Sequence, residues 1–448
     1  MRKLVLTRGI QGSGKSHFLR QEDGLGFVLS TDKIRLMMSS PRMNFEGGFS
    51  VAQNINKEVF AFLAGVAKSR MERGDTTFID ATFANARDFK PFLELARRFN
   101  YEVACLNFNT PLSLALKRNN LRPELFRVPE SAIRKYAERI ESSTIPGGVR
   151  VIPVDAESPE KARAQLNEFL DEMVFDFGAA RRIIHIGDIH GCFSALREAL
   201  LYVKPTKDDV VIFIGDYFDR GIENGETMRW LVDIGMRQWN FHFLRGNHES
   251  HLMRYVHDEE PVSAIFAKET LPQILAAGIN KDDMREVYCG LRDILFYRAG
   301  DTRVMVTHAG ISTAPRREAL KTLSAKDCVN GVGNYGDDID AIFSENMKAK
   351  EMCGEESWVQ IHGHRNLGHH KTLDYKRSIN LEGGVEAGGD LRLVVLEGEK
   401  WHPINIKNKV FEAREIESKD RFEKKRGHGA NISHQPSEET SCQPPHKM

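Results

Sequence analysis

The pattern of apolar and polar positions divides the chain into two segments with predicted strands and helices, followed by a polar tail. In residues 1–177, short apolar runs rich in β-branched and aromatic side chains predict strands at 4–7, 27–30, 76–80, 103–108 and 149–154. Helical spacing of apolar positions fills the gaps, most clearly at 52–73, 86–99 and 159–174. This alternation is typical of a parallel sheet that helices cover on both faces, so we predict an α/β first domain.

The second stretch, residues 181–407, has predicted strands at 183–186, 210–214 and 304–306 that end in clusters of Asp, His, Asn and Gly. Layered α/β folds place their sites at strand ends, so we predict a second α/β domain with its chemistry there. Residues 412–448 carry few large apolar side chains. Because such a segment buries too little surface to offset its ordering entropy, we predict a disordered tail.

Composition and charge narrow the function classes. The 448 residues would suffice for about three domains, and 41% apolar with 28% charged residues is an ordinary globular composition. Lys and Arg total 63, as do Asp and Glu, so the overall charge is balanced, and any polyanion would have to bind to a local cluster of positive charge.

No apolar run approaches the ~20 residues that span a bilayer, and no signal peptide is evident. We expect a cytoplasmic protein without membrane contact. Six cysteines without CxxC spacing predict neither a disulfide framework nor a zinc site.

A phosphate-binding loop follows the first predicted strand. Residues 9–16 fit the pattern G-x-x-x-x-G-K-S at the start of a helix. Glycines allow positive φ in such a loop, its backbone N–H groups face phosphates, Lys15 neutralises phosphate oxygens and Ser16 holds Mg²⁺. We therefore predict ATP and Mg²⁺ as cofactors, bound by Gly9, Gly12, Ser13, Gly14, Lys15, Ser16 and, at the end of the third strand, Asp80.

Two further patterns concern the phosphate acceptor. Asp32 and Arg35 lie one helical turn apart after the second strand, which suits a carboxylate that accepts a hydroxyl proton beside a guanidinium that binds phosphate. The alternative is that Asp32 only caps the following helix. Residues 117–135 hold six Lys and Arg against two Glu, which favours a lid whose Arg118 and Arg122 stabilise phosphoryl transfer. A solvated basic helix is the alternative there.

These residues together resemble the 5′-polynucleotide kinases of phage and bacterial end-repair enzymes, over roughly residues 1–175. The resemblance implies that Asp32 is the general base for a 5′-OH and that Arg35 binds the acceptor's 3′-phosphate. It further implies that Arg118 and Arg122 bind the donor phosphates. P-loop kinases for small molecules share much of this pattern.

Five polar clusters follow one another in the second stretch: G-D-I-H-G at 187–191, G-D-Y-F-D-R-G at 215–221, G-N-H-E at 246–249, T-H-A-G at 307–310 and H-G-H-R at 362–365. They resemble the calcineurin-like metallophosphoesterases over nearly all of residues 182–400, and the resemblance implies that this domain is an α/β sandwich. Two divalent cations about 3.5–4 Å apart can bind phosphate oxygens and activate water, and they need oxygen and imidazole ligands. The resemblance implies metal ligands at Asp188, His190, the bridging Asp216, Asn247, His308 and His364. Such ligands favour Mn²⁺, with Mg²⁺, Fe and Ni²⁺ left open.

Three neighbouring residues complete this predicted site. The resemblance implies that Arg220 clamps phosphate oxygens and that His248 acts as the general acid or orients the nucleophile. We expect Asp219 to orient His248. We interpret His362 as a non-ligand. Glu382 stands where bacterial end-repair phosphatases have Asp, and its role is left open.

The order of the two domains resembles the bacterial polynucleotide kinase-phosphatases, here without their ligase domain. We therefore expect phosphorylation of 5′-OH ends and removal of 3′-phosphate or 2′,3′-cyclic phosphate from RNA or DNA, with sealing left to a separate ligase. Self-association into a homo-oligomer stays open. One alternative is a small-molecule or nucleotide kinase joined to a phosphatase for phosphoproteins or dinucleoside polyphosphates. Another is an ATP-gated regulatory module.

Overall fold

Buried apolar runs in the first domain form a five-stranded sheet with the order β2-β5-β1-β6-β7, in which every pair is parallel. The computed structural model describes residues 2–20, 28–43, 48–52, 54–155, 157–315, 323–365 and 377–411, and the predicted tail at 412–448 lies outside them. The parallel sheet predicted from the strand–helix alternation is confirmed. Its strands are β1 (Lys3–Arg8), β2 (Val28–Ser30), β5 (Thr77–Asp80), β6 (Glu102–Phe108) and β7 (Arg150–Val154).

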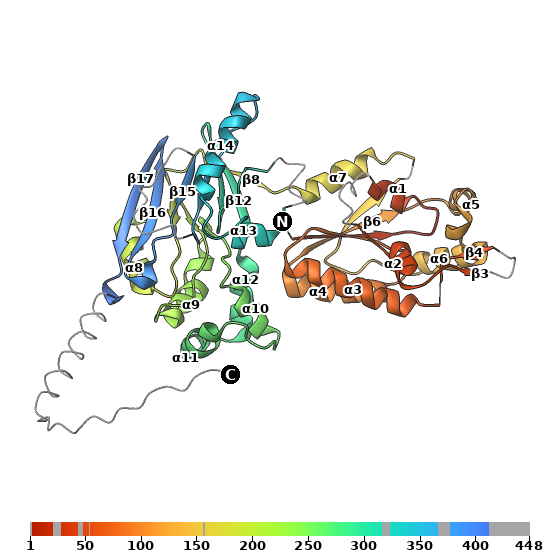
Figure 1. Ribbon diagram of the computed structural model, residues 1–448, viewed down its shortest axis with the longest axis horizontal. Helices are drawn as coiled ribbons and strands as arrows, with labels where there is room; N and C mark the ends of the chain where they lie inside the picture. Colours follow the sequence, from red (N-terminus) through yellow and green to blue (C-terminus); the bar gives the residue numbers. More distant parts are fainter. Residues whose placement is uncertain are drawn as a thin grey trace, which may run out of the picture.

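Helices cover both faces of this sheet (Figure 1). One face packs on α3 and α4 through residues such as Leu63 and Phe89, and the other packs on α1 and α7 through Phe18 and Leu166. A short hairpin and a 3-10 turn lie beside the helices. The elements are α1 (Lys15–Arg20), α2 (Thr31–Met38), β3 (Arg42–Met43), β4 (Phe49–Ser50), α3 (Asn56–Glu72), α4 (Ala86–Phe99), α5 (Leu112–Asn120), η1 (Glu124–Phe126), α6 (Glu130–Glu141) and α7 (Glu160–Leu170).

The helix predicted at 159–174 is wrong at its carboxyl end. Helix α7 stops at Leu170, and Val174 begins strand β8 (Val174–Asp176). This strand pairs in parallel with β12 (Ile294–Ala299) of the second domain, with Val174 opposite Phe296. Val174 continues the helical spacing of apolar residues, but a strand partner far along the chain determines its conformation.

The second domain is a sandwich of two five-stranded sheets, ordered β11-β10-β9-β16-β17 and β15-β14-β13-β12-β8. Their facing sides share one apolar core that includes Ile212, Tyr297 and Ile361. Other apolar clusters join the outer faces to helices, so the predicted α/β sandwich is confirmed. Its further strands are β9 (Arg182–Ile186), β10 (Asp209–Phe213), β11 (Phe241–Phe243), β13 (Thr302–Thr307), β14 (Val359–His362), β15 (Ser378–Asn380), β16 (Asp390–Glu397) and β17 (Lys400–Lys407).

Helices α8 to α12 contribute apolar side chains to the core on the outer face of the first sheet, and α13 and α14 contribute to the core on the outer face of the second. Their bounds are α8 (Phe193–Val203), α9 (Asn224–Asp233), η2 (Gly235–Arg237), α10 (Ser250–Val256), η3 (Phe266–Thr270), α11 (Leu271–Ala276), α12 (Lys281–Gly290), α13 (Ala325–Asn330), α14 (Ile339–Met352) and η5 (Val385–Ala387). Among the residues described, no helix combines the length and apolar character that crossing a bilayer requires.

The two domains lie side by side and contact each other (Figure 1). The guanidinium of Arg2 donates to Asp293 at 3.1 Å, and the side-chain amide of Asn100 donates to the carbonyl of Cys289 at 3.1 Å. The second domain is thus held to the first by hydrogen bonds as well as by the chain between α7 and β8.

Candidate functional site

The loop between β1 and α1 has the backbone that its glycines predict. Gly9, Gly12 and Gly14 have φ of 156°, 83° and 99°. A Cβ on Gly12 would lie 2.2 Å from the carbonyl oxygen of Ala115, so no larger residue fits there. Lys15 Nζ donates to the carbonyls of Gly9 and Ile10, both at 2.8 Å. Burial lowers the pKa of Lys15 to about 8, against the opposing charges of Asp80 and Asp32. The ammonium is therefore enclosed by the loop, where it can exchange carbonyls for phosphate oxygens.

Ser16 and Asp80 meet beside this lysine. Ser16 Oγ donates to Asp80 Oδ2 at 2.6 Å, and Asp80 ends strand β5 with only 6% of its surface exposed. Burial raises the pKa of Asp80, opposed by the charge of Lys15. A hydroxyl and a carboxylate side by side next to a phosphate loop are the oxygen ligands that Mg²⁺ prefers. The predicted ligands Ser16 and Asp80 are thus brought together by the fold.

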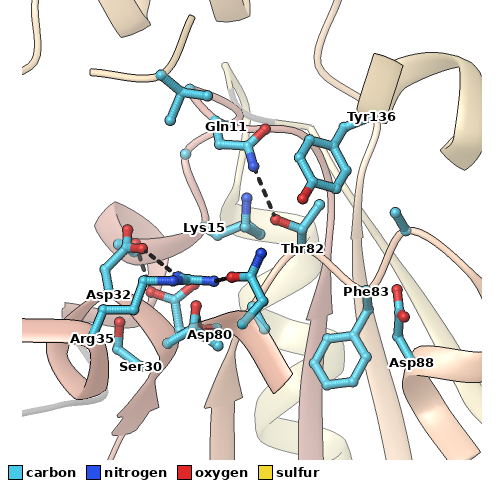
Figure 2. A pocket seen from close by; sticks show the side chains of 18 of the residues that line it. Gln11, Lys15, Ser30, Asp32, Arg35, Asp80, Thr82, Phe83, Asp88 and Tyr136 are labelled. Atoms are coloured by element: carbon cyan, nitrogen blue, oxygen red, sulfur yellow. Dashed lines mark hydrogen bonds and ion pairs between the residues drawn. The ribbon is translucent and has the colours of Figure 1, made fainter. Parts of the chain in front are cut away.

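Asp32 and Arg35 face the same cavity from helix α2. Arg35 Nη1 donates to Asp32 Oδ1 at 3.0 Å, and Arg122 Nη2 lies 3.6 Å from Asp32 Oδ2. Arg35 is fixed from its other side by Asn56 Oδ1 at 2.5 Å (Figure 2). The N-cap position of α2 belongs to Ser30, and Asp32 lies in the first turn. The two arginines therefore orient the Asp32 carboxylate, whose side chain is 41% exposed, toward the cavity.

This cavity has a volume of about 600 Å³ and joins the phosphate loop, the acceptor residues and the lid. Figure 2 shows Lys15, Asp32, Arg35 and Asp80 around it. The predicted lid residues Arg118 and Arg122 also line it. Further polar and aromatic side chains line the cavity from segments without a motif, so the sequence did not indicate them; they include Asn56, Asn85, Asp88, Tyr136 and Arg139.

The polar clusters of the second domain converge because their strands are parallel neighbours. Strands β9, β10 and β11 form one parallel set, and β13 and β14 form another. Asp216 lies at the centre of the convergence. Its Oδ2 is 3.2 Å from His308 Nε2, 3.6 Å from His190 Nε2 and 3.9 Å from His248 Nε2. A carboxylate between imidazoles from separate loops is the arrangement that a bridging ligand requires.

The hydrogen bonds of two imidazoles suit metal ligation. His190 Nδ1 lies 3.1 Å from the carbonyl of Phe218, and His308 Nδ1 lies 2.9 Å from the carbonyl of Ile214. Each carbonyl selects the tautomer with its proton on Nδ1, which leaves the electron pair of Nε2, on the side of Asp216, for a cation. Such carbonyl contacts commonly orient metal-bound histidines.

Buried side-chain oxygens that lack a hydrogen-bond partner provide an independent test of whether this site can hold cations. Asp188 Oδ1 and Asn247 Oδ1 are buried without a hydrogen-bond partner in the described structure. Burial and the adjacent Glu382 carboxylate raise the pKa of Asp188 well above its usual value. Buried acceptors and paired carboxylates are costly without positive charge. The donor set of carboxylate, amide and imidazole groups therefore fits divalent cations.

Among the described residues, four groups have ligand atoms within 4.8 Å of one another: His190 with Asp216 and His248, Asp216 with His308 and His364, Asp188 with His190 and Glu382, and Asp219 with His248 and His251. The structure thus places Glu382, whose role the sequence left open, beside the predicted ligands. Glu382 follows strand β15 and is 6% exposed. In contrast, His362 Nε2 contacts Asp340 at 3.0 Å, and His362 is in none of these groups.

The remaining predicted residues surround this centre. Asp219 Oδ2 accepts from His248 Nδ1 at 2.6 Å, the contact that an orienting carboxylate would make. Arg220 Nη2 lies 3.4 Å from His248 Nε2, and its Nη1 donates to Glu386 Oε1 at 3.1 Å. The Arg220 side chain is 45% exposed, so its guanidinium stays accessible to a phosphate. Glu386 was not anticipated from the sequence.

Backbone strain is concentrated here. Nine non-glycine residues of the described chain have positive φ, and five belong to this centre: His190, Asp216, Asp219, Arg220 and His364. Such conformations are costly and persist where the surroundings enforce them. The strain indicates that the loops are shaped for their side chains.

Glu249 ties two of the loops together. Its buried carboxylate accepts from the backbone N–H groups of Gly246 at 2.7 Å, Tyr217 at 2.8 Å and Asp216 at 3.1 Å. A Cβ on Gly246 would lie 2.0 Å from Asp216 Oδ1, so the approach of these loops requires glycine. Glu249 belongs to the G-N-H-E cluster, but the sequence assigned it no role.

Known proteins match the two domains separately. Residues 4–142 match the family model of AAA domains, and residues 181–396 match that of calcineurin-like phosphoesterases. A symmetrical bis(5′-nucleosyl)-tetraphosphatase from Marinomonas sp. (strain MWYL1) is 31% identical over 141 residues, which are 31% of this chain and 48% of the relative. The chain thus spans about half the length of this curated relative.

Solved structures similar to this chain include a putative diadenosine tetraphosphatase, with 19% identity, a TM-score of 0.35 and coverage of 52% of this chain and 97% of the other. Another is a protein serine/threonine phosphatase from Saccharomyces cerevisiae, with 14% identity, a TM-score of 0.36 and coverage of 62% and 96%. By its two family matches, the chain joins a kinase-like P-loop domain of the AAA type to a calcineurin-like metallophosphoesterase domain.

Proposed function

We propose that the chain repairs nucleic-acid ends: it phosphorylates 5′-OH ends with ATP and removes 3′-phosphate or 2′,3′-cyclic phosphate in a metal-dependent reaction. The observation that carries the proposal is the Asp32 carboxylate held between Arg35 and Arg122 in the cavity of the phosphate loop. The phosphoesterase centre in the same chain supports a paired reaction on the two sides of one break.

In the kinase half, separate sets of residues would bind the phosphate donor, ATP, and the phosphate acceptor, the 5′-OH end. Lys15 and the loop N–H groups would bind the ATP phosphates, with Mg²⁺ held by Ser16 and Asp80. Asp32 would accept the proton of the 5′-OH, because its two arginines fix its carboxylate at the cavity. Arg118 and Arg122 would balance the negative charge that develops on the transferred phosphoryl group.

In the phosphatase half, the six predicted ligands would hold the cations, with Glu382 beside Asp188 and His190. Two divalent cations, with Mn²⁺ expected, supply positive charge to the phosphate oxygens and to the attacking water when bound. Arg220 would clamp the phosphate from the open side of the centre. His248, oriented by Asp219, would donate a proton to the leaving oxygen.

Two substitutions test the pair of sites. Lys15→Ala should abolish 5′ phosphorylation and preserve the phosphatase, whereas Asp216→Ala should do the reverse. The assay uses 5′-OH and 3′-phosphate oligonucleotides of RNA and DNA with ATP and Mn²⁺ or Mg²⁺. Lys90→Ala, which changes an exposed lysine on α4, serves as the control. No change at either end of any oligonucleotide would refute the proposal, as would loss of both activities in folded Lys15→Ala.

The bis(5′-nucleosyl)-tetraphosphatase relative supports a second candidate, in which the phosphatase half cleaves dinucleoside polyphosphates. Comparison of kcat/KM for diadenosine tetraphosphate and for a 3′-phosphate oligonucleotide separates the two. A hundredfold preference for the dinucleotide would replace the end-repair proposal for this half.

A further inference from the structure

A buried threonine lies behind the Asp219–His248 pair of the phosphoesterase site. Thr270 is the last residue of η3, a π-helical turn, and it has no exposed surface. Its Oγ1 donates to Asp219 Oδ1, while Asp219 Oδ2 accepts from His248 Nδ1 at 2.6 Å. A continuous chain of hydrogen bonds therefore runs from Thr270 through Asp219 to the imidazole at the metal centre.

Because Asp219 is buried, these hydrogen bonds restrict the orientation of its carboxylate. Asp219 is fully buried, and a buried carboxylate needs donors at both oxygens. Rotation of an aspartate carboxyl about its last bond is otherwise soft. With Thr270 on one oxygen and His248 on the other, the carboxylate plane is fixed at two points. That plane sets the direction in which the imidazole can lie.

The segment that carries Thr270 also holds the loop that carries Asp219. Gln273 Oε1 accepts from the backbone N–H of Asn224 at 3.0 Å and from its Nδ2 at 3.1 Å. Asn224 Oδ1 in turn accepts from the backbone N–H of Asp219 at 2.9 Å. Asp219 has a φ of 71°, so its conformation needs such support. Thr270, at the end of a π-helical turn, thus supports the side chain of Asp219, and Gln273, on the adjoining helix α11, supports its backbone through Asn224. Such turns are frequent at functional sites.

We propose that Thr270 is a positioning residue for phosphoester hydrolysis, which fixes His248 through Asp219 so that Nε2 faces the leaving-group oxygen. The inference rests on the proposed function of the phosphatase half. In the step, the water oxygen forms a new P–O bond, the P–O bond to the leaving group breaks, and His248 Nε2 gives its proton to the leaving oxygen. The imidazole then recovers the proton that the water released, so the products are an alcohol and inorganic phosphate.

The test compares leaving groups. Thr270→Val keeps the shape of the side chain and removes its hydroxyl, and Thr270→Ser keeps the hydroxyl. Hydrolysis of a 3′-phosphate ester of an alkyl alcohol needs proton donation, whereas p-nitrophenyl phosphate releases a stable anion. We expect Thr270→Val to lower kcat for the alkyl ester about tenfold, with a much smaller loss on the aryl ester and little change in KM. Thr270→Ser should resemble the wild type.

A matched control is Thr227→Val, because Thr227 is equally buried on α9 and donates only to the carbonyl of Glu223 within the described structure. Proton NMR of the metal-free protein gives a second readout. The Nδ1–H signal of His248, identified by its loss in His248→Asn, should shift or exchange faster in Thr270→Val. Thr270→Ala is measured in parallel in case the valine variant does not fold.

Equal losses on both esters, or an unchanged His248 signal, would overturn the positioning role. So would an impaired Thr270→Ser variant. If the wild type hydrolyses neither ester, the phosphatase activity itself fails, and the inference fails with it. If the wild type is active and Thr270→Val has the same activity, the positioning role is refuted, while the proposed phosphatase function stands.

Discussion

Asp209, the first residue of β10, is a fully buried carboxylate with several donors. It accepts from Arg181 Nη2 at 2.6 Å, Arg182 Nη2 at 2.9 Å and the backbone N–H of Thr206 at 2.8 Å. Burial opposes its ionisation, but the hydrogen bonds from Arg182 and Arg181 hold the pKa of Asp209 well below its usual range. A depressed folded-state pKa means that this stabilisation is complete above the unfolded pKa of about 4 and declines as the pH falls below it.

We therefore expect Asp209→Asn to lower the free energy of unfolding of the second domain at pH 7 by about 2 kcal/mol. The difference from the wild type should shrink between pH 4 and pH 2. Urea unfolding at pH 7 and pH 3 measures both effects. Asp208→Asn, at the exposed neighbouring position, is the control. A difference that is independent of pH would contradict the argument.

At the scale of elements, Glu249 joins the loops after β10 and β11 by accepting three backbone N–H groups. Glu249→Gln keeps the shape but presents an amide N–H₂ where an acceptor is needed. Because these loops carry Asp216 and Asn247, we expect a 10- to 100-fold weaker Mn²⁺ affinity, measured by titration calorimetry. Glu226→Gln, at an exposed position on α9, should leave the affinity unchanged. Unchanged Mn²⁺ binding in Glu249→Gln would show that the loops keep their positions without this carboxylate.

Local patterns predicted the elements whose conformation depends on local packing. Helix α4 matches the predicted range 86–99, because Phe89, Phe92 and Ala96 form one buried stripe. The end of α7 was predicted too far along the chain, because Val174 pairs with a strand of the other domain. Spacing along the chain carries no information about that partner.

The same distinction applies to the sites. Residues within motifs, such as Lys15 and Asp216, could be predicted because their chemistry requires neighbours at fixed spacing. Thr270 and Glu386 contact the phosphoesterase site from segments that lack a motif. Their contribution depends on packing between distant segments, so only the folded chain reveals it.

At the scale of the whole molecule, one buried carboxylate joins the two domains. Asp293 forms ion pairs with Arg2 of the first domain and with Arg245 of the second, and the three side chains are 5%, 12% and 3% exposed. Arg245 also donates to the hydroxyl of Tyr288 at 2.5 Å. It directly precedes the G-N-H-E cluster, so the domain contact lies next to the phosphoesterase loop. A second ion pair between the domains, Arg98 with Glu259, is more exposed, at 27% and 23%.

Because the Asp293 cluster and the Arg98–Glu259 pair differ in burial, we expect their disruption to lower stability by unequal amounts. Asp293→Asn leaves two buried guanidinium groups without a counter-charge, which should lower the free energy of unfolding by about 3–5 kcal/mol. Glu259→Gln breaks a partly hydrated pair and should cost no more than about 1 kcal/mol. Because Arg245 adjoins the loop of Asn247 and His248, Asp293→Asn should also reduce phosphatase activity more than kinase activity. Calorimetric melting and both activities, measured on the same preparation, test this. Equal destabilisation by the two variants would contradict the argument from burial. A parallel loss of both activities would show that the contact holds the domains together without supporting the phosphoesterase loop.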